Sequence, residues 1–254
     1  MTTGGLHILS GLIIASFIRN EKYKKAKWGL VWGSIFPDID LIATAIMFLI
    51  TGDLEGSIYI HRTVTHGFFA MGLVLLIGVI ISRTREDLRW ISMFSIAFAF
   101  GMLTHTFYDL LDGYVSILAP FIWTKYSITG SILGYQTNTI YITAFNDTGY
   151  KAWNAFDVMS DALIYLLLWY WATHKANIPK EQKFSKILLI VALIGIAYFG
   201  VLFGLAFTDI SVDMHLVLIY IVWILLFLPF TTVLIHIKLR KTIQDFSFLE
   251  FRKT

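Results

Sequence analysis

Eight His and Asp side chains in the first half of this 254-residue chain have the chemistry of metal ligands. Most of them lie within, or at the ends of, stretches that are otherwise apolar enough to cross a bilayer. Ionisable groups in such stretches are expensive unless they pair with one another or with a metal. Mixed imidazole and carboxylate ligands suit Zn²⁺, Mn²⁺ or Fe²⁺, so the pattern predicts a membrane-embedded centre for one or two divalent ions, with zinc favoured. The eight residues are His7, Asp38, Asp40, His61, His66, His105, Asp109 and Asp112.

The clearest spacing is that of His105, Asp109 and Asp112, which stand at positions i, i+4 and i+7 of an apolar segment expected to be helical. This spacing places the three side chains on one helix face, where they can point at a common ion. The alternative is a helix end with capping or solvated acids, which the apolar neighbours Leu103 and Phe107 disfavour.

Two further motifs place acids and imidazoles where hydrocarbon would otherwise exclude them. Residues 37–40 (Pro-Asp-Ile-Asp) break an apolar run, and a cation would compensate the two acids, one of which could bridge two metals. A turn in an interfacial loop is the alternative. His61 and His66 stand five residues apart, which is wrong for one helix face. We therefore expect His61 in a loop and His66 just inside the next helix, although surface histidines before a helix are also common.

Charged residues near these motifs have expected roles other than ligation. Arg62 and Lys125 would neutralise charge that develops on a substrate phosphate. Arg62 suits bidentate contact with an anionic group, and contact with a lipid headgroup is the alternative. One acid, Asp112 or Asp40, would act as general base instead of as a ligand.

Later acids and histidines form a second tier. Asp157 and Asp161 stand at i and i+4, where they could add ligands or orient the histidines. Helix capping explains them equally well. The remaining candidates are expected to be solvated or to lie at the membrane interface: His174, Asp209, Asp213, His215 and His236.

Composition places the chain among integral membrane proteins. It is 57% hydrophobic and 15% charged, with 8 Trp, 12 Tyr and 21 Phe, whereas ordinary soluble domains are about 45–50% apolar and about 25% charged. The net charge of +3 is too small to indicate nucleic-acid binding. Cysteine is absent, which excludes disulfides, thiolate ligands and iron–sulfur clusters. The N-terminus lacks the basic region of a cleavable signal peptide.

Apolar runs between charge clusters predict an all-α, polytopic transmembrane bundle that forms a single membrane domain over residues 1–254. Lys and Arg gather in alternate loops, which predicts a multi-pass cell-membrane protein with its N-terminus outside and its C-terminus in the cytoplasm. The metal-site motifs, within residues 1–125, then face the extracytoplasmic side. The long irregular segment 113–156 is expected to cap them there. Seven membrane segments are expected, at roughly 5–18, 28–50, 67–82, 90–111, 157–173, 187–207 and 215–237.

Together these motifs resemble the YdjM-like family of inner-membrane-bound, metal-dependent hydrolases, over about residues 1–125. The resemblance implies a polytopic membrane fold and hydrolysis assisted by a divalent metal, with the His and Asp residues as ligands. It also implies a distant similarity to zinc-dependent phospholipase C. This chain differs from those enzymes in its seven expected spans and its insertion at 113–156, so the resemblance does not identify the substrate. The matching motifs are His7, Gly33-Ser34-Ile35-Phe36-Pro37-Asp38-Ile39-Asp40, His61-Arg62-Thr63-Val64-Thr65-His66, Thr104-His105 with Asp109 and Asp112, and Ala119-Pro120-Phe121.

Metal-assisted hydrolysis of a phosphoester, in a lipid or lipid-linked substrate, is the leading hypothesis. A transporter for metal ions or protons is the first alternative, because intramembrane His and Asp chains also build ion relays. The inner halves of the spans are apolar, which disfavours conduction. A di-iron membrane oxygenase ranks last, because such enzymes use more histidines, in closely spaced boxes. The expected partners are the bilayer and a lipid substrate.

Overall fold

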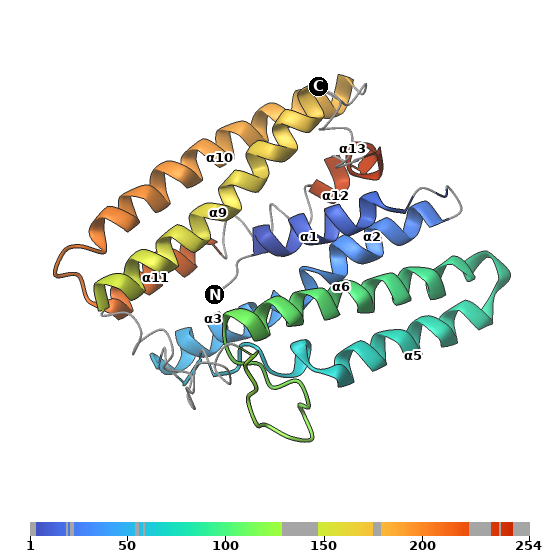
Figure 1. Ribbon diagram of the computed structural model, residues 1–254, viewed down its shortest axis with the longest axis horizontal. Coiled ribbons are helices and arrows are strands. Elements are labelled where there is room, and N and C mark those ends of the chain that lie inside the picture. Colours follow the sequence, from blue (N-terminus) through green and yellow to red (C-terminus); the bar gives the residue numbers. More distant parts are fainter. Residues whose placement is uncertain are drawn as a thin grey trace. The chain divides into compact units, whose positions relative to one another are not determined.

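The computed structural model describes residues 4–18, 20, 23–53, 56–57, 59–128, 147–174, 179–223, 235–238 and 240–245. Apart from turns, these residues form helices, with one isolated antiparallel bridge between Val115 and Tyr126 (Figure 1). The predicted all-α class is therefore confirmed for the described part of the chain. The chain divides into two compact units: an N-terminal unit built mainly from His7–Gln136 and a C-terminal unit built mainly from Thr137–Phe246.

The N-terminal unit is built around a long helix, α6. Its neighbours α5 and α2 both pack against it, and α5 runs beside it in the opposite direction (Figure 1). Short 3-10 turns connect the helices. The elements are α1 (Gly4–Ser16), α2 (Lys24–Gly33), η2 (Phe36–Ile39), α3 (Asp40–Thr51), η3 (Val64–His66), α5 (Phe68–Thr84), η4 (Glu86–Leu88) and α6 (Trp90–Asp112).

Glycines let α2 and α6 pack backbone against backbone. A Cβ atom added to Gly33 would overlap the carbonyl oxygen of Phe98, and one added to Gly101 would overlap that of Leu30. Small residues at helix contacts are typical of membrane proteins, where close van der Waals packing replaces the hydrophobic effect. This close approach brings the end of α2 against α6 next to the functional residues.

The apolar run at 28–50 is broken, as the sequence predicts. Lys24–Gly33 and Phe36–Thr51 meet at an angle of 49°. Pro37 lies in the first turn of η2, a position where its missing N–H is tolerated. Asp40 begins α3, and a carboxylate in a first turn is favoured by the unpaired N–H groups there. The break therefore places two acids, Asp38 and Asp40, at the start of the second helical segment.

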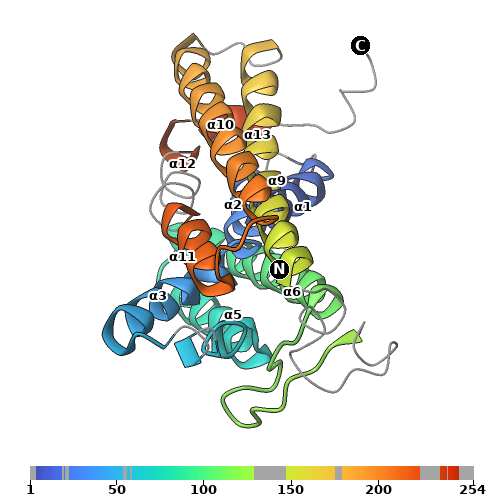
Figure 2. The same cartoon turned by 90° about the vertical axis from the view of Figure 1, so that its left-hand side faces the viewer.

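The C-terminal unit is a helical hairpin of α9 and α10 with α11 packed beside it (Figure 2). Lys151 of α9 is buried and donates to the carbonyl oxygens of Thr208 and Ile210, at 3.0 and 2.9 Å, which ties α9 to the turn after α10. The elements are α9 (Asp147–His174), α10 (Pro179–Leu205), α11 (Val212–Val222), α12 (Ile235–Lys238) and α13 (Arg240–Asp245).

Helix α9 begins at Asp147, earlier than the start at 157 expected for the fifth membrane segment. Residues 147–156 of the expected cap are therefore helical, because the segment from Asp147 onward continues the same helix without a break. Residues 129–146 lie outside the described residues. The remaining part, 113–128, follows α6 as an irregular loop that projects from the α5–α6 pair in both views (Figures 1 and 2).

Three helices in the described residues are long and apolar enough to span a membrane: Glu86–Leu111, Asp147–His174 and Lys183–Leu205. The bent pair at 24–51 makes a fourth if it counts as one span. The described residues thus support three or four spans and not the expected seven. Two expected segments form helices of only 12 and 17 residues, Gly5–Ser16 and Phe68–Thr84, against about 20 for a span. The seventh falls largely on residues 224–234, outside the described residues.

Candidate metal centre

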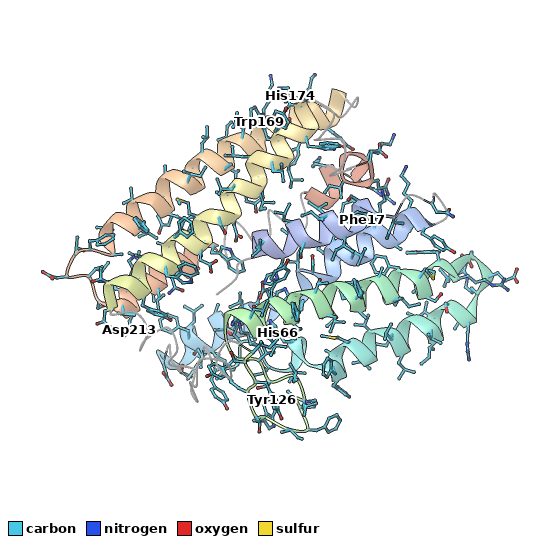
Figure 3. All side chains as sticks on the ribbon, viewed as in Figure 1. Phe17, His66, Tyr126, Trp169, His174 and Asp213 are labelled. Carbon is cyan, nitrogen blue, oxygen red and sulfur yellow. The ribbon has the colours of Figure 1, made fainter. Side chains whose placement is uncertain are left out.

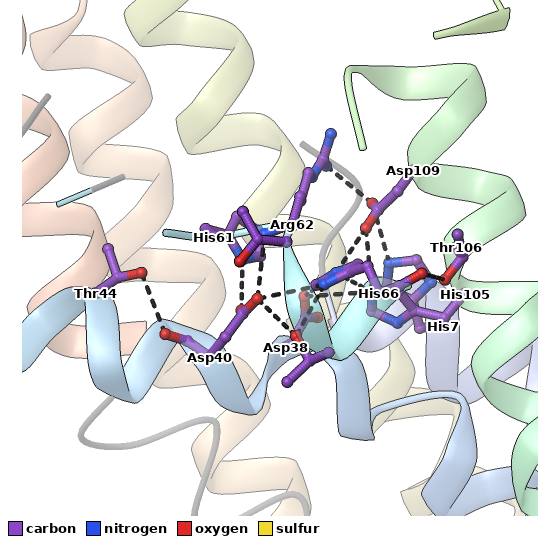
Figure 4. A network of polar contacts seen from close by, with 12 residues as sticks. His7, Asp38, Asp40, Thr44, His61, Arg62, His66, His105, Thr106 and Asp109 are labelled. Carbon is purple, nitrogen blue, oxygen red and sulfur yellow. Dashed lines mark hydrogen bonds and ion pairs between the residues drawn. The ribbon is translucent and has the colours of Figure 1, made fainter. Parts of the chain in front are cut away.

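Residues far apart in the sequence meet in one buried polar cluster of the N-terminal unit (Figures 3 and 4). They come from α1, from the break between α2 and α3, from the turn before α5 and from the last turns of α6. Each of these residues is at most 8% exposed. The cluster contains His7, Asp38, Asp40, His61, Arg62, His66, His105 and Asp109.

Four ligand-type atoms form the centre of the cluster. Nε2 of His66 lies 3.2 Å from Nε2 of His105. Oδ2 of Asp109 lies 3.0 and 3.2 Å from these two nitrogens. Oδ1 of Asp38 lies 3.3 Å from Nε2 of His105 and 3.9 Å from Nε2 of His66. The four residues form a group able to hold one metal ion.

The hydrogen bonds of the two imidazoles leave the central nitrogens as acceptors. Nδ1 of His105 lies 2.8 Å from the carbonyl oxygen of Ser34, which can only accept, so this nitrogen carries the proton. Nδ1 of His66 faces Oδ2 of Asp40 at 3.3 Å. In neutral rings both Nε2 atoms are then lone-pair acceptors. Together with two carboxylates they bring four acceptors to one point, which only protons or a cation can hold together.

The spacing of these atoms fits tetrahedral coordination. With metal–ligand bonds of about 2.0–2.1 Å, neighbouring ligands of a tetrahedral zinc site lie roughly 3.3–3.4 Å apart. Four of the five distances given above fall between 3.0 and 3.3 Å, and the fifth is 3.9 Å. Two imidazoles and two carboxylates are also a donor set that suits zinc or another borderline divalent ion. The residues present therefore fit a metal by both chemistry and spacing.

Asp40 is surrounded by donors. Its Oδ1 lies 2.7 Å from Nδ1 of His61. Its Oδ2 accepts from the backbone N–H of Arg62 at 3.1 Å and from the hydroxyl of Thr65 at 2.7 Å, and faces Nδ1 of His66. Asp40, His61 and His66 also form a second group able to hold an ion. A carboxylate with four such neighbours has its lone pairs engaged, which is the arrangement of a group that orients ligands.

Arg62 holds an unusual backbone conformation, with a φ of 64°, which is uncommon for a residue other than glycine. Its N–H donates to Asp40, and its carbonyl oxygen accepts from the N–H of Ser116 at 3.0 Å. Its guanidinium Nη2 lies 2.9 Å from Oδ1 of Asp109. The left-handed turn thus lets one residue bind both an acid of α3 and an acid of α6.

His7 lies beside the central group and outside both groups able to hold an ion. Its ring stacks on that of His105 with centroids 3.6 Å apart, and its Nε2 lies 3.8 Å from Oδ1 of Asp109. It is fully buried, and neither ring nitrogen has a hydrogen-bond partner among the described residues. Buried polar atoms are usually paired, which makes this imidazole a candidate for a role in the chemistry of the site.

His66 was expected just inside the next helix, and this expectation is wrong in detail. It ends η3, and Gly67 separates it from α5. The hydroxyl of Thr106 donates to the carbonyl oxygen of His66 at 3.0 Å and fixes this turn on α6. Burial alone would lower the pKa of His66, but its hydrogen bonds to Asp109 and Asp40 outweigh burial and raise that pKa.

Lys125 lies in the loop after α6, with its Nζ 4.1 Å from the centre of the Tyr59 ring. It makes no ion pair with the central acids in the described residues. Burial and the charge of Arg62 lower the pKa of Lys125. Asp112 ends α6, and its side chain lies outside the described residues. The structure therefore adds nothing to the expected role of Asp112 as ligand or base.

The second-tier acids belong to the C-terminal unit. Asp161 is buried in α9, where it accepts from the N–H of Gly5, a residue that belongs to the C-terminal unit although α1 from His7 onward does not, and from Nε1 of Trp223, the latter at 2.6 Å. These partners give Asp161 a structural role within that unit. Asp157 precedes it by one turn and belongs to neither group able to hold an ion. His215 is fully buried and bonds the carbonyl oxygen of Leu202 at 2.8 Å, which corrects the expectation that it is solvated.

Sequence reasoning missed the backbone and hydroxyl groups that orient the ligands. The carbonyl of Ser34 and the hydroxyl of Thr106 leave no recognisable spacing, because each meets its histidine only through tertiary packing. Thr65 has such a signal, since it directly precedes His66.

Comparison with known proteins identifies the family of the chain. The sequence model of the family described as YdjM inner membrane protein matches residues 1–227. No curated protein and no solved structure matches the chain. The matched range contains every residue of the buried cluster and most of the chain. The protein therefore belongs to the YdjM inner membrane protein family.

Proposed function

We propose that this protein is a membrane-embedded, metal-dependent hydrolase that acts on a phosphoester in a lipid or lipid-linked substrate. The observation that carries the proposal is the buried group of four acceptor atoms from Asp38, His66, His105 and Asp109. A family of inner membrane proteins supplies the lipid surroundings. Ionisable residues kept in such surroundings are functional by default.

The four central residues would hold the ion, and Asp40 would orient them. Through Nδ1 of His66, Asp40 directs Nε2 of that ring to the centre, and Ser34 does the same for His105. A bound divalent ion would lower the pKa of a water molecule from 15.7 towards about 7 and polarise a phosphoryl oxygen. A second ion could bind at Asp40, His61 and His66 only if Asp40 gave up hydrogen bonds that it now accepts.

Cations of the chain itself would stabilise the substrate. Arg62 is held against Asp109 at the edge of the central group, where its charge would oppose the negative charge that develops on a phosphoryl group. Lys125 would add to this field from the loop after α6.

His7 is better placed than Asp40 to transfer a proton. The lone pairs of Asp40 are engaged by its four neighbours, whereas both nitrogens of His7 lack hydrogen-bond partners among the described residues. Its Nε2 lies on the side of Asp109 and Arg62. General bases must reach the proton that they remove, so a substrate bound near Arg62 would lie within range. Asp112 remains the alternative base.

The expected topology places this centre on the extracytoplasmic side. Arg83, Arg85 and Arg89 surround the turn between α5 and α6, at the end of α6 opposite to Asp109. Positively charged loops favour the cytoplasm, so the central group would lie towards the other face. Our proposal includes the predicted topology of seven spans with an external N-terminus.

Transport of a metal ion or proton is a weaker candidate, because the polar cluster does not continue along the membrane. Within α6, no charged residue occurs between Trp90 and Thr104, and α5 carries none before Arg83. A relay would need ionisable groups at intervals across the bilayer. Flux of the metal into liposomes that contain the protein would favour transport over hydrolysis.

The deciding experiment uses the full chain, purified in detergent and returned to lipid nanodiscs. Elemental analysis should find a divalent metal, and chelation should abolish release of phosphate from a phosphatidic acid or lipid diphosphate probe. Re-addition of zinc or manganese should restore it. Replacement of the exposed His174 by Gln should change neither result. Full activity of metal-free protein would contradict the proposal.

A further inference from the structure

The loop after α6 exposes a run of large apolar side chains. Phe121, Ile122 and Trp123 are 76%, 47% and 51% exposed. They are consecutive in the sequence, so they form one patch at the tip of the loop. Exposed apolar patches of this kind mark contact with a partner or a membrane.

This exposure belongs to an ordered loop. Val115 and Tyr126 exchange two backbone hydrogen bonds of 2.9 Å at its base. The carbonyl oxygen of Ile117 accepts from the N–H of Phe68 at 2.9 Å, and Ala119 is fully buried. The tip is therefore presented outward by a fixed base (Figure 3, where Tyr126 marks the loop).

The patch continues onto the outer face of α5. The ring of Phe121 packs edge-on against that of Phe69, with centroids 5.4 Å apart. From there, exposed apolar residues follow the helix at intervals of three or four: Phe69, Leu73, Leu76 and Ile80. On a helix of an inner membrane protein, such a stripe suits contact with lipid. The loop thus extends a lipid-facing surface beyond the start of α5.

The residue types at the tip suit the boundary between hydrocarbon and headgroups. Tryptophan and tyrosine concentrate at this level of a bilayer, and long cationic side chains reach from it towards water. Trp123, Lys125 and Tyr126 supply these types within four residues. At the opposite end of α5, about 25 Å away for 17 residues, the turn carries Arg85 and Asp87 instead.

From this arrangement we propose that Phe121, Ile122 and Trp123 insert into the interfacial region of one membrane leaflet, on the side of the metal centre. The occupant of the patch is lipid and not a second protein. The carbonyl of Arg62 accepts from Ser116 at the base of the loop, so insertion would bring the headgroup level next to Arg62. This inference stands without the proposed hydrolysis, because it concerns only where the loop lies.

The absence of cysteine allows a direct test by spin labelling. In nanodiscs of phosphatidylethanolamine and phosphatidylglycerol, a nitroxide on Ile122→Cys should be more accessible to oxygen than to a water-soluble nickel chelate. A label on Asp87→Cys, in the exposed charged turn, should show the reverse. Phe121→Cys provides a second position if the first variant does not fold.

The outcomes separate the three possible surroundings of the loop. Preferential oxygen access at 121 and 122 supports insertion. Free access of the nickel chelate at both positions would place the tip in water and overturn the inference. Protection from both reagents would indicate a protein partner and overturn it equally. None of these readings depends on metal content or activity.

Discussion

The Nε2 atoms of His66 and His105 lie 3.2 Å apart, although Nδ1 of each ring faces an oxygen acceptor. Two neutral imidazoles in this arrangement would direct lone pairs at each other. Asp109 and Asp38 add negative charge to the same point. The arrangement is stable only with a positive charge between the rings, and a divalent ion would satisfy all four groups at once.

Loss of a central ligand should weaken metal binding strongly. We expect His105→Gln to weaken zinc affinity by more than the roughly 10–100-fold that follows loss of an outer-shell group, because one of four donors is removed. Isothermal titration with zinc in nanodiscs measures this. His174→Gln removes an exposed histidine of α9 and should bind zinc like the wild type. Equal affinity in both variants would remove His105 from the ligand set.

Loss of Asp40 should weaken the site without removing an ion. Asp40→Asn keeps the volume but cannot fix the protons of His61 and His66 in the same way, so zinc affinity should fall by about 10–100-fold. The number of ions per chain, measured by elemental analysis at saturating zinc, should stay at its wild-type value. A drop from two ions to one would instead make Asp40 a ligand of a second metal.

Metal affinity should fall as the pH falls. His66, which lies in a turn outside the candidate spans, has a pKa raised above its ordinary value of 6.5, so a proton competes with metal there at higher pH than at a free histidine. Without metal the sign of the stability effect reverses: a raised pKa stabilises the fold at low pH, and this contribution is lost as the pH rises through it.

Thermal unfolding with and without zinc, from pH 5.5 to 8.5, measures both effects. The stabilisation by zinc should grow over this range while the melting temperature of the chelated protein declines. A stabilisation that is independent of pH would mean that no proton is displaced from His66.

The close approach of α2 and α6 should tolerate no added methyl group. Gly33→Ala would push Cβ into the backbone of Phe98, and overpacking of this kind costs about 1–3 kcal/mol. Gly72→Ala on α5 is the matched control, because nothing lies within 4 Å of its added Cβ; the higher helix propensity of alanine should leave it neutral or slightly stabilised. Unfolding in detergent with increasing denaturant compares them, and equal midpoints would contradict the tight contact.

Spacing in the sequence predicted which residues lie together, but it did not predict the contacts that orient them. The i, i+4 pair His105 and Asp109 does share one helix face, with 3.2 Å between Nε2 and Oδ2. The broken helix at Pro37 was equally readable. The left-handed Arg62 was not, because its conformation is maintained by Asp40 and Ser116 from other parts of the chain.

Among the described residues, fewer helices are long enough to span a membrane than the hydropathy pattern predicts, for a related reason. The run from Phe68 is apolar enough for a membrane, yet its helix has only 17 residues and starts beside the polar turn of His66. The first segment forms an even shorter helix, of 13 residues, that carries the buried His7. Composition shows that a run is apolar, whereas the length of the helix that it forms depends on where the neighbouring polar turns lie.

An ion held by Asp38, His66 and the two residues of α6 would join three stretches of chain that are otherwise linked by long connections. It would act as a reversible cross-link within the N-terminal unit, comparable to a covalent bridge in a protein that has no cysteine. Newly inserted chains that lack metal would keep these stretches separable and open to membrane proteases. Supply of the ion, as well as of substrate, could thereby set how much of the protein persists in the cell.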